Sequence, residues 1–343
     1  MYPLFYASPP TARYAPAFMT LYTPVLLIAW RRPHTTQQVI NAIRAVKPTR
    51  MFVACDGPNP KRPGEAAKVE ATREVIEREI DWPCTIERRY SEVNQGCKLG
   101  VSGAINWFFD QVEAGIILED DCVPHPDFFY FCSTLLDLYR DDQRVWTITG
   151  NNFQNDQRYG DVSYFFTKYN HIWGWATWRR AWQNYKIDIP FWPKWKQSKD
   201  WQNIVLNEKE RYIWERNFDA VYEDRIDTWD YQWTACIWHQ KGLTATPNVN
   251  LVSNIGYGID ATHTTSKSGG GIENLSCKAL DKLTHPHDVI RNKEAEMNSY
   301  MNRYGGKYLK NKPILYLNTK FALIKIYTAV FAWIKVVVQR ETK

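Results

Sequence analysis

The stretch GIILEDDCVPHPDFFYF, residues 115–131, decides the fold that the rest of the sequence predicts. An apolar run typical of a buried strand leads directly into three adjacent acids, Glu119, Asp120 and Asp121, and an aromatic-rich helix is expected from Pro126. A carboxylate at the end of a buried strand costs free energy unless something compensates for it. Capping of the following helix explains one acid, but it does not easily explain three that also repel each other.

A divalent cation at the end of this strand would account for the three acids. Carboxylate and phosphate oxygens are the ligands that Mg²⁺ and Mn²⁺ prefer, and one or two protein carboxylates with a nucleotide diphosphate complete an octahedral shell. Acidic triplets are also common on protein surfaces, so the interpretation depends on the strand before them. The sequence therefore predicts a metal–diphosphate site that holds Mn²⁺ or Mg²⁺.

Apolar runs and amphipathic segments alternate along the first part of the chain. The runs expected as strands are 24–30, 50–57, 84–90, 115–119 and 144–150, and the segments expected as helices are 35–46, 65–80, 99–112 and 126–142. Thr35 is the expected N-cap of the first helix. This alternation predicts an α/β fold whose mostly parallel sheet carries helices on both faces. Ligands of such sheets bind beyond the carboxyl ends of the strands.

The pattern changes after residue 150. The segment HIWGWATWRRAWQNY (171–185) is expected to be a loop that leads into a helix, and WDYQWTACIWHQKG (229–242) a helix that ends near its last residue. LTATPN (243–248) has the composition of a strand. The glycine-rich stretch SNIGYGIDATHTTSKSGGG (253–271) is expected to be either a mobile lid or a disordered loop.

Composition and charge exclude some classes of function. The net charge of +6 is mild, and no run of five Lys or Arg occurs, so the chain is not expected to bind nucleic acid. A mildly basic surface also suits an anionic membrane or a phosphorylated substrate. The 16 Trp and 20 Tyr residues predict an aromatic core, and some of these rings could stack on sugars. Seven cysteines without a CxxC pattern predict free thiols in a reducing compartment.

The two ends of the sequence lack clear targeting signals. Residues 1–24 show no basic region followed by a long apolar stretch, so no signal peptide is expected, and Met1 and Met19 are both candidate start sites. No apolar run of 18 residues predicts a transmembrane helix. Residues 314–338 are apolar but carry lysines, so they are expected either to lie at a membrane interface or to pack on the domain.

These segments together resemble the GT-A fold glycosyltransferases. Residues 115–131 are similar to the strand–DxD–helix segment of the N-acetylglucosaminyltransferase I type, and the order of the segments is also that of bacterial family 2-like glycosyltransferases. Further segments resemble that family in the same order: PVLLIAWRRPHTTQQ (24–38), FVACDG (52–57), IWGWATWRRAW (172–182), TWDYQW (228–233) and VSNIGYGIDATH (252–263). The resemblance covers about residues 24–265 and implies a metal-dependent, inverting transferase that uses a nucleotide-diphospho-sugar.

The resemblance implies roles for the donor side of the site. Asp121 matches the acid that binds Mn²⁺ or Mg²⁺, while Glu119 and Asp120 match acids that face the ribose and sugar of the donor. Asp56 matches an acid that contacts the base or ribose, although an Asp-Gly pair is also a strong turn signal. Two further candidates rest on position: Arg31 or Arg32 could reach the diphosphate or base, and Lys98 precedes a helix N-terminus that suits phosphate.

The acceptor side requires a general base. A carboxylate on the far side of the sugar deprotonates the acceptor hydroxyl in inverting enzymes. Asp230 in TWDYQW lies where the family carries this base. The family shows two adjacent acids before the second Trp, whereas Asp230 is followed by Tyr and Gln, so Asp227 and Asp224 remain alternatives.

Four further residues are candidates for substrate binding. Trp173, Gly174 and Trp175 could shape the sugar pocket, since Gly permits a close approach of the backbone, and each Trp could equally belong to the core. His263 lies in the glycine-rich loop, where it could contact the diphosphate or remain in solvent.

The sequence thus predicts an N-terminal extension (1–23), a GT-A catalytic domain (24–265) and a C-terminal helical segment (266–343). Within the catalytic domain, residues 24–150 would bind the nucleotide-sugar, most simply a UDP-sugar, and residues 151–265 a glycan or lipid-linked acceptor. A cytoplasmic enzyme with peripheral membrane contact is expected. Two alternatives stay open: a non-catalytic carbohydrate-binding protein on a transferase-like fold, and a sugar nucleotidyltransferase, although AWRRPHTT (29–36) lacks its glycine-rich signature loop.

Overall fold

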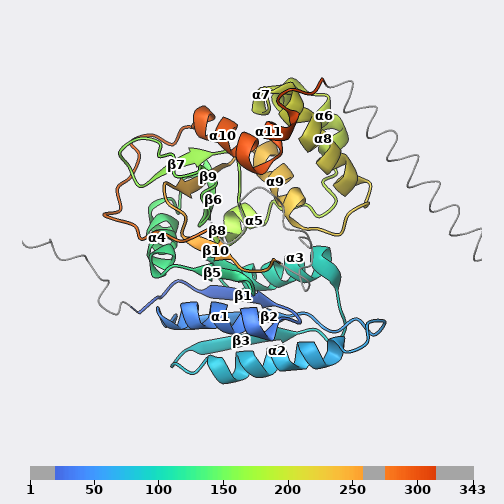
Figure 1. Ribbon diagram of the computed structural model, residues 1–343, viewed down its shortest axis with the longest axis vertical. Coiled ribbons are helices and arrows are strands. Elements are labelled where there is room, and N and C mark those ends of the chain that lie inside the picture. Colours follow the sequence, from blue (N-terminus) through green and yellow to red (C-terminus); the bar gives the residue numbers. More distant parts are fainter. Residues whose placement is uncertain (1–19, 258–274, 314–343) are drawn as a thin grey trace, which may run out of the picture.

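The computed structural model describes residues 20–257 and 275–313, and it confirms the predicted α/β class. The central sheet (Figure 1) comprises β1 (Val25–Ala29), β2 (Arg50–Cys55), β3 (Thr85–Tyr90), β4 (Ala114–Glu119), β6 (Val145–Thr149), β7 (Tyr164–Thr167), β8 (Trp175–Trp178) and β9 (Leu243–Pro247). Its eight strands run in the order β3-β2-β1-β4-β8-β6-β9-β7. The pairs β1–β2, β1–β4, β2–β3 and β6–β9 are parallel, and the other three are antiparallel. The mostly parallel sheet is consistent with a Rossmann-like GT-A fold.

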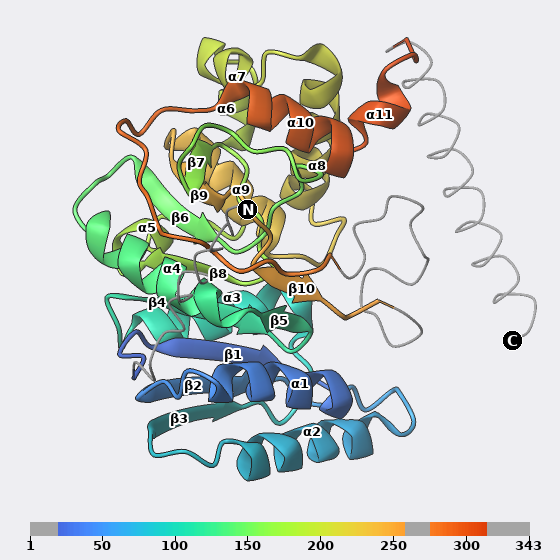
Figure 2. The ribbon, with the colours of Figure 1, turned by 60° about the vertical axis from the view of Figure 1, so that its left-hand side comes forward.

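Helices cover both faces of this sheet (Figures 1 and 2). They are α1 (Pro33–Arg44), α2 (Glu65–Glu79), α3 (Gly96–Phe109), α4 (Pro126–Leu138), α5 (Arg179–Trp182), α6 (Trp192–Lys196), α7 (Lys199–Ile204), α8 (Glu208–Tyr222), α9 (Asp230–His239), α10 (Lys293–Arg303) and α11 (Gly306–Leu309). A small second sheet pairs β5 (Cys122–Pro124) with β10 (Val252–Asn254) in antiparallel orientation. Helices α10 and α11 lie with α6, α7 and α8 at the end of the molecule far from β3 (Figure 2).

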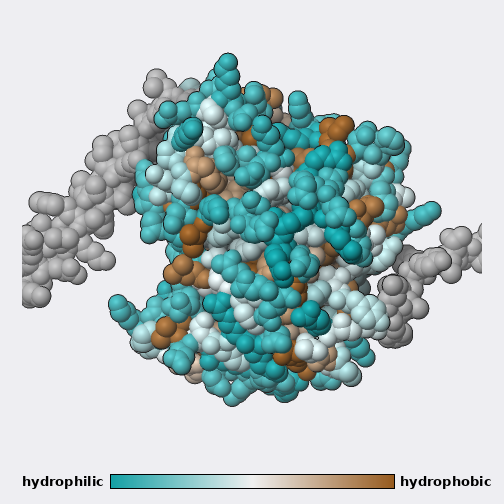
Figure 3. Space-filling model, turned by 180° about the vertical axis from the view of Figure 1, so that it is seen from behind, coloured by the Kyte–Doolittle hydropathy of each residue, from teal (hydrophilic) through white to brown (hydrophobic). Residues whose placement is uncertain are grey.

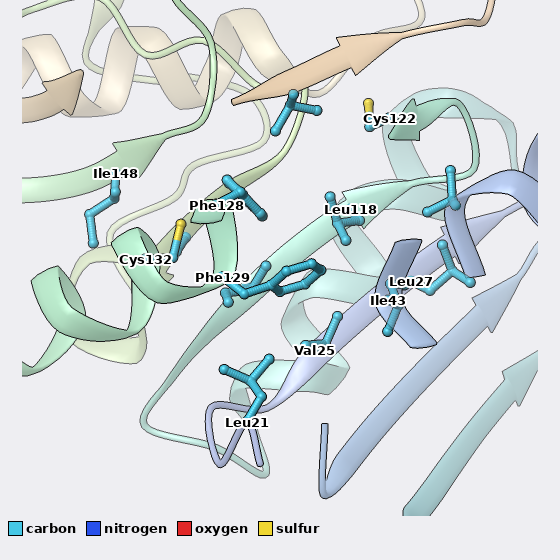
Figure 4. Close-up of a cluster of buried hydrophobic side chains, with 14 of the residues drawn as sticks. Leu21, Val25, Leu27, Ile43, Leu118, Cys122, Phe128, Phe129, Cys132 and Ile148 are labelled. Atoms are coloured by element: carbon cyan, nitrogen blue, oxygen red, sulfur yellow. The ribbon is translucent and has the colours of Figure 1, made fainter. Parts of the chain in front are cut away.

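Alternate residues of the central strands pack into two separate cores. Val25 and Leu27 of β1 face a core with side chains from α1, α2 and α4, which Figure 4 shows around Ile43, Phe128 and Leu118. The residues between them, such as Leu26 of β1 and Ile117 of β4, face the other core, to which α3, α5, α6, α8 and α9 contribute side chains. A strand whose two faces are both buried must be apolar throughout, which is why β1 and β4 read as continuous apolar runs.

The first helix starts earlier than the sequence predicts. Pro33 is its first residue and Arg32 occupies the N-cap position, so the prediction of Thr35 as N-cap is wrong. Proline is favoured at the first helical position because its fixed φ suits the helix and its missing N–H has no partner there anyway. The hydroxyls of Thr35 and Thr36 instead donate to the carbonyl of Arg32.

Residues 171–185 were expected to be a loop followed by a helix, and this expectation is wrong in part. Trp175–Trp178 form β8, which lies between β4 and β6 in the middle of the sheet and pairs with both in antiparallel orientation. A buried apolar run of four residues carries no periodicity that separates strand from helix. Only the short helix α5 follows it.

Most of the aromatic residues form the core, as the simpler interpretation predicted. Trp175 stacks on Trp229 at 5.7 Å, and Trp182 and Trp233 complete the cluster. All seven cysteines are free thiols, as expected. The face shown in Figure 3 is mostly hydrophilic, with small groups of apolar residues between polar ones. Among the described residues, no helix is long and apolar enough to cross a membrane.

Some of the expected features lie outside the described residues. They are the N-terminal extension up to residue 19, the part of the glycine-rich loop that contains His263, and the apolar segment 314–338. The C-terminal segment 266–343 was expected to be helical, and α10 and α11 lie within its described part.

Gly174 offers a test of how tightly β8 is joined to its neighbours. Its φ of +78° is strained for other residues, and a Cβ there would lie 2.8 Å from Val252 Cγ2 and 3.3 Å from Leu118 Cδ2. Gly64 has a similar φ of +76° but open space around it. We expect Gly174→Ala to lower the free energy of unfolding by about 2 kcal/mol more than Gly64→Ala, because only Gly174→Ala adds overpacking to the backbone strain. Urea denaturation of both variants measures this difference, and equal losses would contradict it.

Candidate active site

A cavity of about 950 Å³ opens at the carboxyl ends of β1, β2 and β4. This is the edge at which ligands of parallel sheets bind, because the strand ends leave a crevice there. The loops after these strands supply one wall, and the segments around α9, β10 and the end of α10 supply others. The residues named as candidates from the sequence that line the cavity are Arg31, Arg32, Asp56, Glu119, Asp120, Asp121, Trp173, Asp227 and Asp230.

The acidic triplet meets one guanidinium group. Arg32, directly after β1, contacts Asp120 through Nη2 and lies 2.7 Å from Asp121 Oδ2 through Nη1. The backbone N–H of Trp30 donates to Asp120 Oδ2 at 2.9 Å. Asp120 is 2% exposed and the Arg32 side chain 14%, so this ion pair is largely shielded from solvent. Burial alone would lower the pKa of Arg32, but Asp120 and Asp121 outweigh burial and raise it.

The triplet remains short of positive charge. Burial, reinforced by Asp121, raises the pKa of Glu119 to about 8. Burial also raises the pKa of Asp120 to about 6, although Arg32 opposes the shift. One guanidinium cannot neutralise three adjacent carboxylates, and desolvation penalises each charge that stays unpaired. The arrangement would be stabilised by a further cation.

Asp121 is the member of the triplet that a cation would meet in the cavity. Its side chain is 13% exposed, and its Oδ1 lies 3.4 Å from Asn254 Nδ2. The described residues contain no group of three or more His, Cys, Asp or Glu side chains that forms a complete metal site. Mg²⁺ and Mn²⁺ need only one or two carboxylates when phosphate oxygens and waters complete the shell. These residues therefore fit a metal that binds together with a diphosphate, provided that Arg32 yields part of its contact with Asp121.

The two arginines between which the sequence left the choice open have different partners in the structure. Arg31 pairs with Glu65 at 3.1 Å and lies over the ring of Trp30, 4.4 Å from its centroid. Arg32 is the arginine that contacts the acidic triplet. Both line the cavity, so both can reach a ligand there.

Asp56 lines the cavity and also organises a turn. Its carboxylate accepts hydrogen bonds from the N–H groups of Gly57 and Gln95 and from Asn94 Nδ2. Burial raises the pKa of Asp56, and these backbone donors oppose the shift. Turn chemistry is thus present at this residue, alongside its position in the cavity.

Lys98 does not line the cavity. Its Nζ lies 2.9 Å from Asp224 and 3.6 Å from Asp188. The N-terminus of α3, which suits phosphate in principle, is instead capped by Asp227, whose carboxylate accepts from the N–H groups of Cys97 and Lys98 at 3.1 and 2.8 Å. Of the two alternative bases, Asp224 therefore pairs with Lys98, and Asp227 accepts from the backbone at the start of α3.

Asp230 is the first residue of α9 and faces the same cavity as the triplet. Its Oδ1 accepts a hydrogen bond from the hydroxyl of Thr228. Asp230 is among the charges that raise the pKa of Glu119, so the two carboxylates lie within electrostatic reach of each other. The cavity thus has one acidic wall at the strand ends and a separate acid at the start of α9.

The three residues of the Trp-Gly-Trp segment separate in space. Trp173 lines the cavity and lies at a right angle to Tyr257, 6.1 Å away. Gly174 packs behind it against Val252 and Leu118, and Trp175 is 1% exposed in the aromatic core. His263 lies outside the described residues.

Sequence reasoning missed Arg303 and Asn254, which also line the cavity. Arg303 is the last residue of α10, far along the chain from every motif, so nothing in the sequence marks it. Asn254 lies within a segment that was read as a glycine-rich loop but that begins as β10. Both reach the site through tertiary packing alone.

No family model and no curated protein matches this sequence. Several solved structures share part of the fold. HddC from Yersinia pseudotuberculosis complexed with GMP-PN is 8% identical over 50% of this chain and 86% of its own, with a TM-score of 0.31. The mannosyltransferase PcManGT from Pyrobaculum calidifontis, in complex with GDP-Man and Mn²⁺, is 10% identical over 64% and 71%, with a TM-score of 0.35. 4-Diphosphocytidyl-2C-methyl-D-erythritol synthase from Anaerococcus prevotii is 8% identical over 58% and 84%, with a TM-score of 0.29. Each is a distant and partial similarity that carries no information about activity.

The ion pair of Arg32 can be tested through stability. We expect Arg32→Met to lower the free energy of unfolding by about 3 kcal/mol, because it leaves the buried Asp120 without its partner. Adding Asp120→Asn should recover a large part of this loss. The control is Arg44→Met, which removes more exposed pairs with Glu79 and Asp81 and should cost clearly less. Denaturant titrations decide the matter, and an Arg32→Met loss no larger than that of the control would count against the buried pair.

A buried histidine beside the cavity predicts a pH dependence of stability. His171 is 5% exposed, and burial together with Arg303 lowers its pKa from 6.5 to about 3. The unfolded chain therefore binds this proton as the pH falls below about 6.5, while the folded protein does not until about pH 3. We expect His171 to reduce the free energy of unfolding by about 1.4 kcal/mol per pH unit between about pH 6 and pH 4.

The matched variant is His171→Phe, which keeps a planar ring and carries no titrating group. Its stability should fall less steeply than that of the wild type over the same pH range, because other titrating groups act equally in both proteins. Parallel slopes in urea denaturation would show that His171 titrates normally in the folded state.

Proposed function

We propose that this protein is a metal-dependent, inverting glycosyltransferase that moves a sugar from a nucleotide-diphospho-sugar to a glycan or lipid-linked glycan. The observation that carries the proposal is the acidic triplet at the carboxyl end of β4, short of positive charge and facing Asp230 across one cavity. The ordered resemblance of residues 24–265 to GT-A transferases supports it. A UDP-sugar is the donor we propose first.

The donor would lie along the strand ends. Asp121 would hold Mn²⁺ or Mg²⁺ together with the diphosphate, with Glu119 and Asp120 facing the ribose and sugar. When bound, the cation would neutralise the charge that develops on the leaving nucleoside diphosphate. Asp120 would keep Arg32 in place beside the diphosphate, where its guanidinium adds positive charge. Asp56 and Arg31 would border the base and ribose.

The acceptor would enter from the side of α9 and Trp173. Asp230 would take the proton from the acceptor hydroxyl as its oxygen attacks the anomeric carbon. The hydroxyl of Thr228 holds one oxygen of the Asp230 carboxylate, which leaves the other free for this proton. In this proposal residues 24–150 serve the donor and residues 151–265 the acceptor, on the cytoplasmic face of a membrane if the acceptor is lipid-linked.

Two other functions use the same cavity in different ways. A carbohydrate-binding protein would bind sugars without turnover, and the aromatic residues around Trp173 suit that role. A sugar nucleotidyltransferase would release pyrophosphate, whereas a glycosyltransferase releases a nucleoside diphosphate. The products therefore separate the three classes.

The first experiment measures thermal unfolding with UDP-sugars and GDP-sugars, in Mn²⁺, in Mg²⁺ and in EDTA. A donor at about a hundred times its dissociation constant stabilises the fold by about 2.7 kcal/mol, which a melting curve detects. We expect one nucleotide class to raise the melting temperature, and both EDTA and Asp121→Asn to remove this rise.

Asp121→Asn, at the end of β4, and Asp230→Asn, at the start of α9, should have different effects. Asp230→Asn should keep the donor-induced rise but reduce release of nucleoside diphosphate by about a hundredfold or more, the usual size of a general-base effect. Asp110→Asn, an exposed acid outside the cavity, should change neither quantity.

If no donor shifts the melting curve in any metal condition, the donor site is refuted and carbohydrate binding becomes the better explanation. Formation of pyrophosphate would instead establish a nucleotidyltransferase.

A further inference from the structure

The end of α10 forms part of the cavity wall. Tyr304, directly after this helix, stacks on Tyr169 with 4.7 Å between ring centroids, and its hydroxyl lies 3.4 Å from His171 Nδ1. The side chain of Asn302 donates to the carbonyl of Phe153 at 3.3 Å. Asn302 and Tyr304, the residues on either side of Arg303, thus hold its backbone in place, and its side chain lines the cavity.

The guanidinium of Arg303 rests on two aromatic rings. Its Cζ lies 5.1 Å from the ring centroid of Trp173 and 5.5 Å from that of Phe153. The two rings meet edge to face at 5.3 Å, so together they form a shelf under the cation. Because the rings stand at 79° to each other, the guanidinium can lie flat on only one of them, and N–H groups at its edge stay able to bind a carboxylate or phosphate.

Arg303 differs from most other arginines of the cavity in its charge partners. Arg31, Arg32, Arg62 and Arg225 each form an ion pair with an acid. Arg89 is exposed and donates to the carbonyl of Gly103, and it too forms no ion pair among the described residues. Within residues 20–257 and 275–313, no carboxylate forms an ion pair with Arg303. A partly buried cation in a cavity gains most from an anion that enters with a ligand, because its desolvation is otherwise uncompensated.

Arg303 lies on the same side of the cavity as Asp230. Tyr304, the neighbour of Arg303, and Tyr231, the neighbour of Asp230, both contact the ring of Trp214, with 5.1 and 5.9 Å between ring centroids. Trp173, the ring beneath the guanidinium, lies within residues 151–265, the part of the chain that we propose binds the acceptor. An anion held here would therefore approach the start of α9 rather than the ends of β1 and β2.

We propose that Arg303, on its shelf of Trp173 and Phe153, binds an anionic group of a ligand in the cavity. Which ligand this is rests on the proposed function. The group is either the carboxylate or phosphate of an acidic sugar in the acceptor, which the position beside Asp230 favours, or the diphosphate of the donor. In the first case Arg303 determines specificity for acidic acceptors.

The experiment compares matched anionic and neutral probes. Glucuronate and glucose, and separately UDP and uridine in Mn²⁺, are titrated into wild-type protein and observed by ligand NMR. Arg303→Met removes the charge but keeps an apolar side chain over the rings, and Arg303→Gln provides a second variant if the first unfolds. Arg158→Met is the control, because Arg158 is exposed and outside the cavity lining.

We expect wild-type protein to bind glucuronate about tenfold or more tightly than glucose, the size of a charge-assisted hydrogen bond, and Arg303→Met to remove this preference. UDP affinity should then stay within about twofold, since the diphosphate lies elsewhere. A loss of UDP affinity with no effect on glucuronate would assign the anion to the donor. If the folded Arg303 variants change neither, the proposal is overturned. Failure of UDP to bind any variant would refute the donor site while the glucuronate comparison still decides the role of Arg303.

Discussion

The buried ion pair between Arg32 and the acids after β4 is the constraint on which the site depends. It joins the end of β1 to the end of β4, two neighbouring strands that are distant in sequence. Asp120 is almost fully buried. If these strand ends moved apart, its carboxylate would lose Arg32 and remain buried without a partner, which is strongly destabilising. The same pair holds Asp121 at the cavity surface. The ion pairs of Arg32 thus contribute both to the stability of the fold and to the geometry of the site.

That contact also explains why three acids stand together. Asp120 serves the fold, since it accepts from Trp30 and Arg32. Glu119 and Asp121 keep carboxyl oxygens near the cavity, and burial together with Asp121 raises the pKa of Glu119 despite the nearby Arg32. A cluster built in this way is neither a plain surface patch nor a finished metal site. In the proposed function, a cation that binds with the ligand would complete it.

The sequence predicted the first half of the fold because each signal there is local. The strand before Glu119, the helix from Pro126 and the Asp56 turn are all set by neighbouring residues and their periodicity. The second half was harder to predict, since β8 is too short to show a period and aromatic residues occur in both its strands and its helices. Arg303 lay beyond prediction, because only the packing of Tyr304 on Tyr169 places it in the cavity.

This packing has a consequence for where the folded unit ends. A polypeptide cut after residue 257 would lose Tyr304 and expose the flat faces of Tyr169 and His171, which it covers. Gln154 and Lys168 would also lose their partners Ser299 and Glu296 on α10. Within the described part of the chain, α10 thus packs against residues 154–171 of the α/β unit. We expect a fragment that ends before α10 to be less stable than one that includes Tyr304.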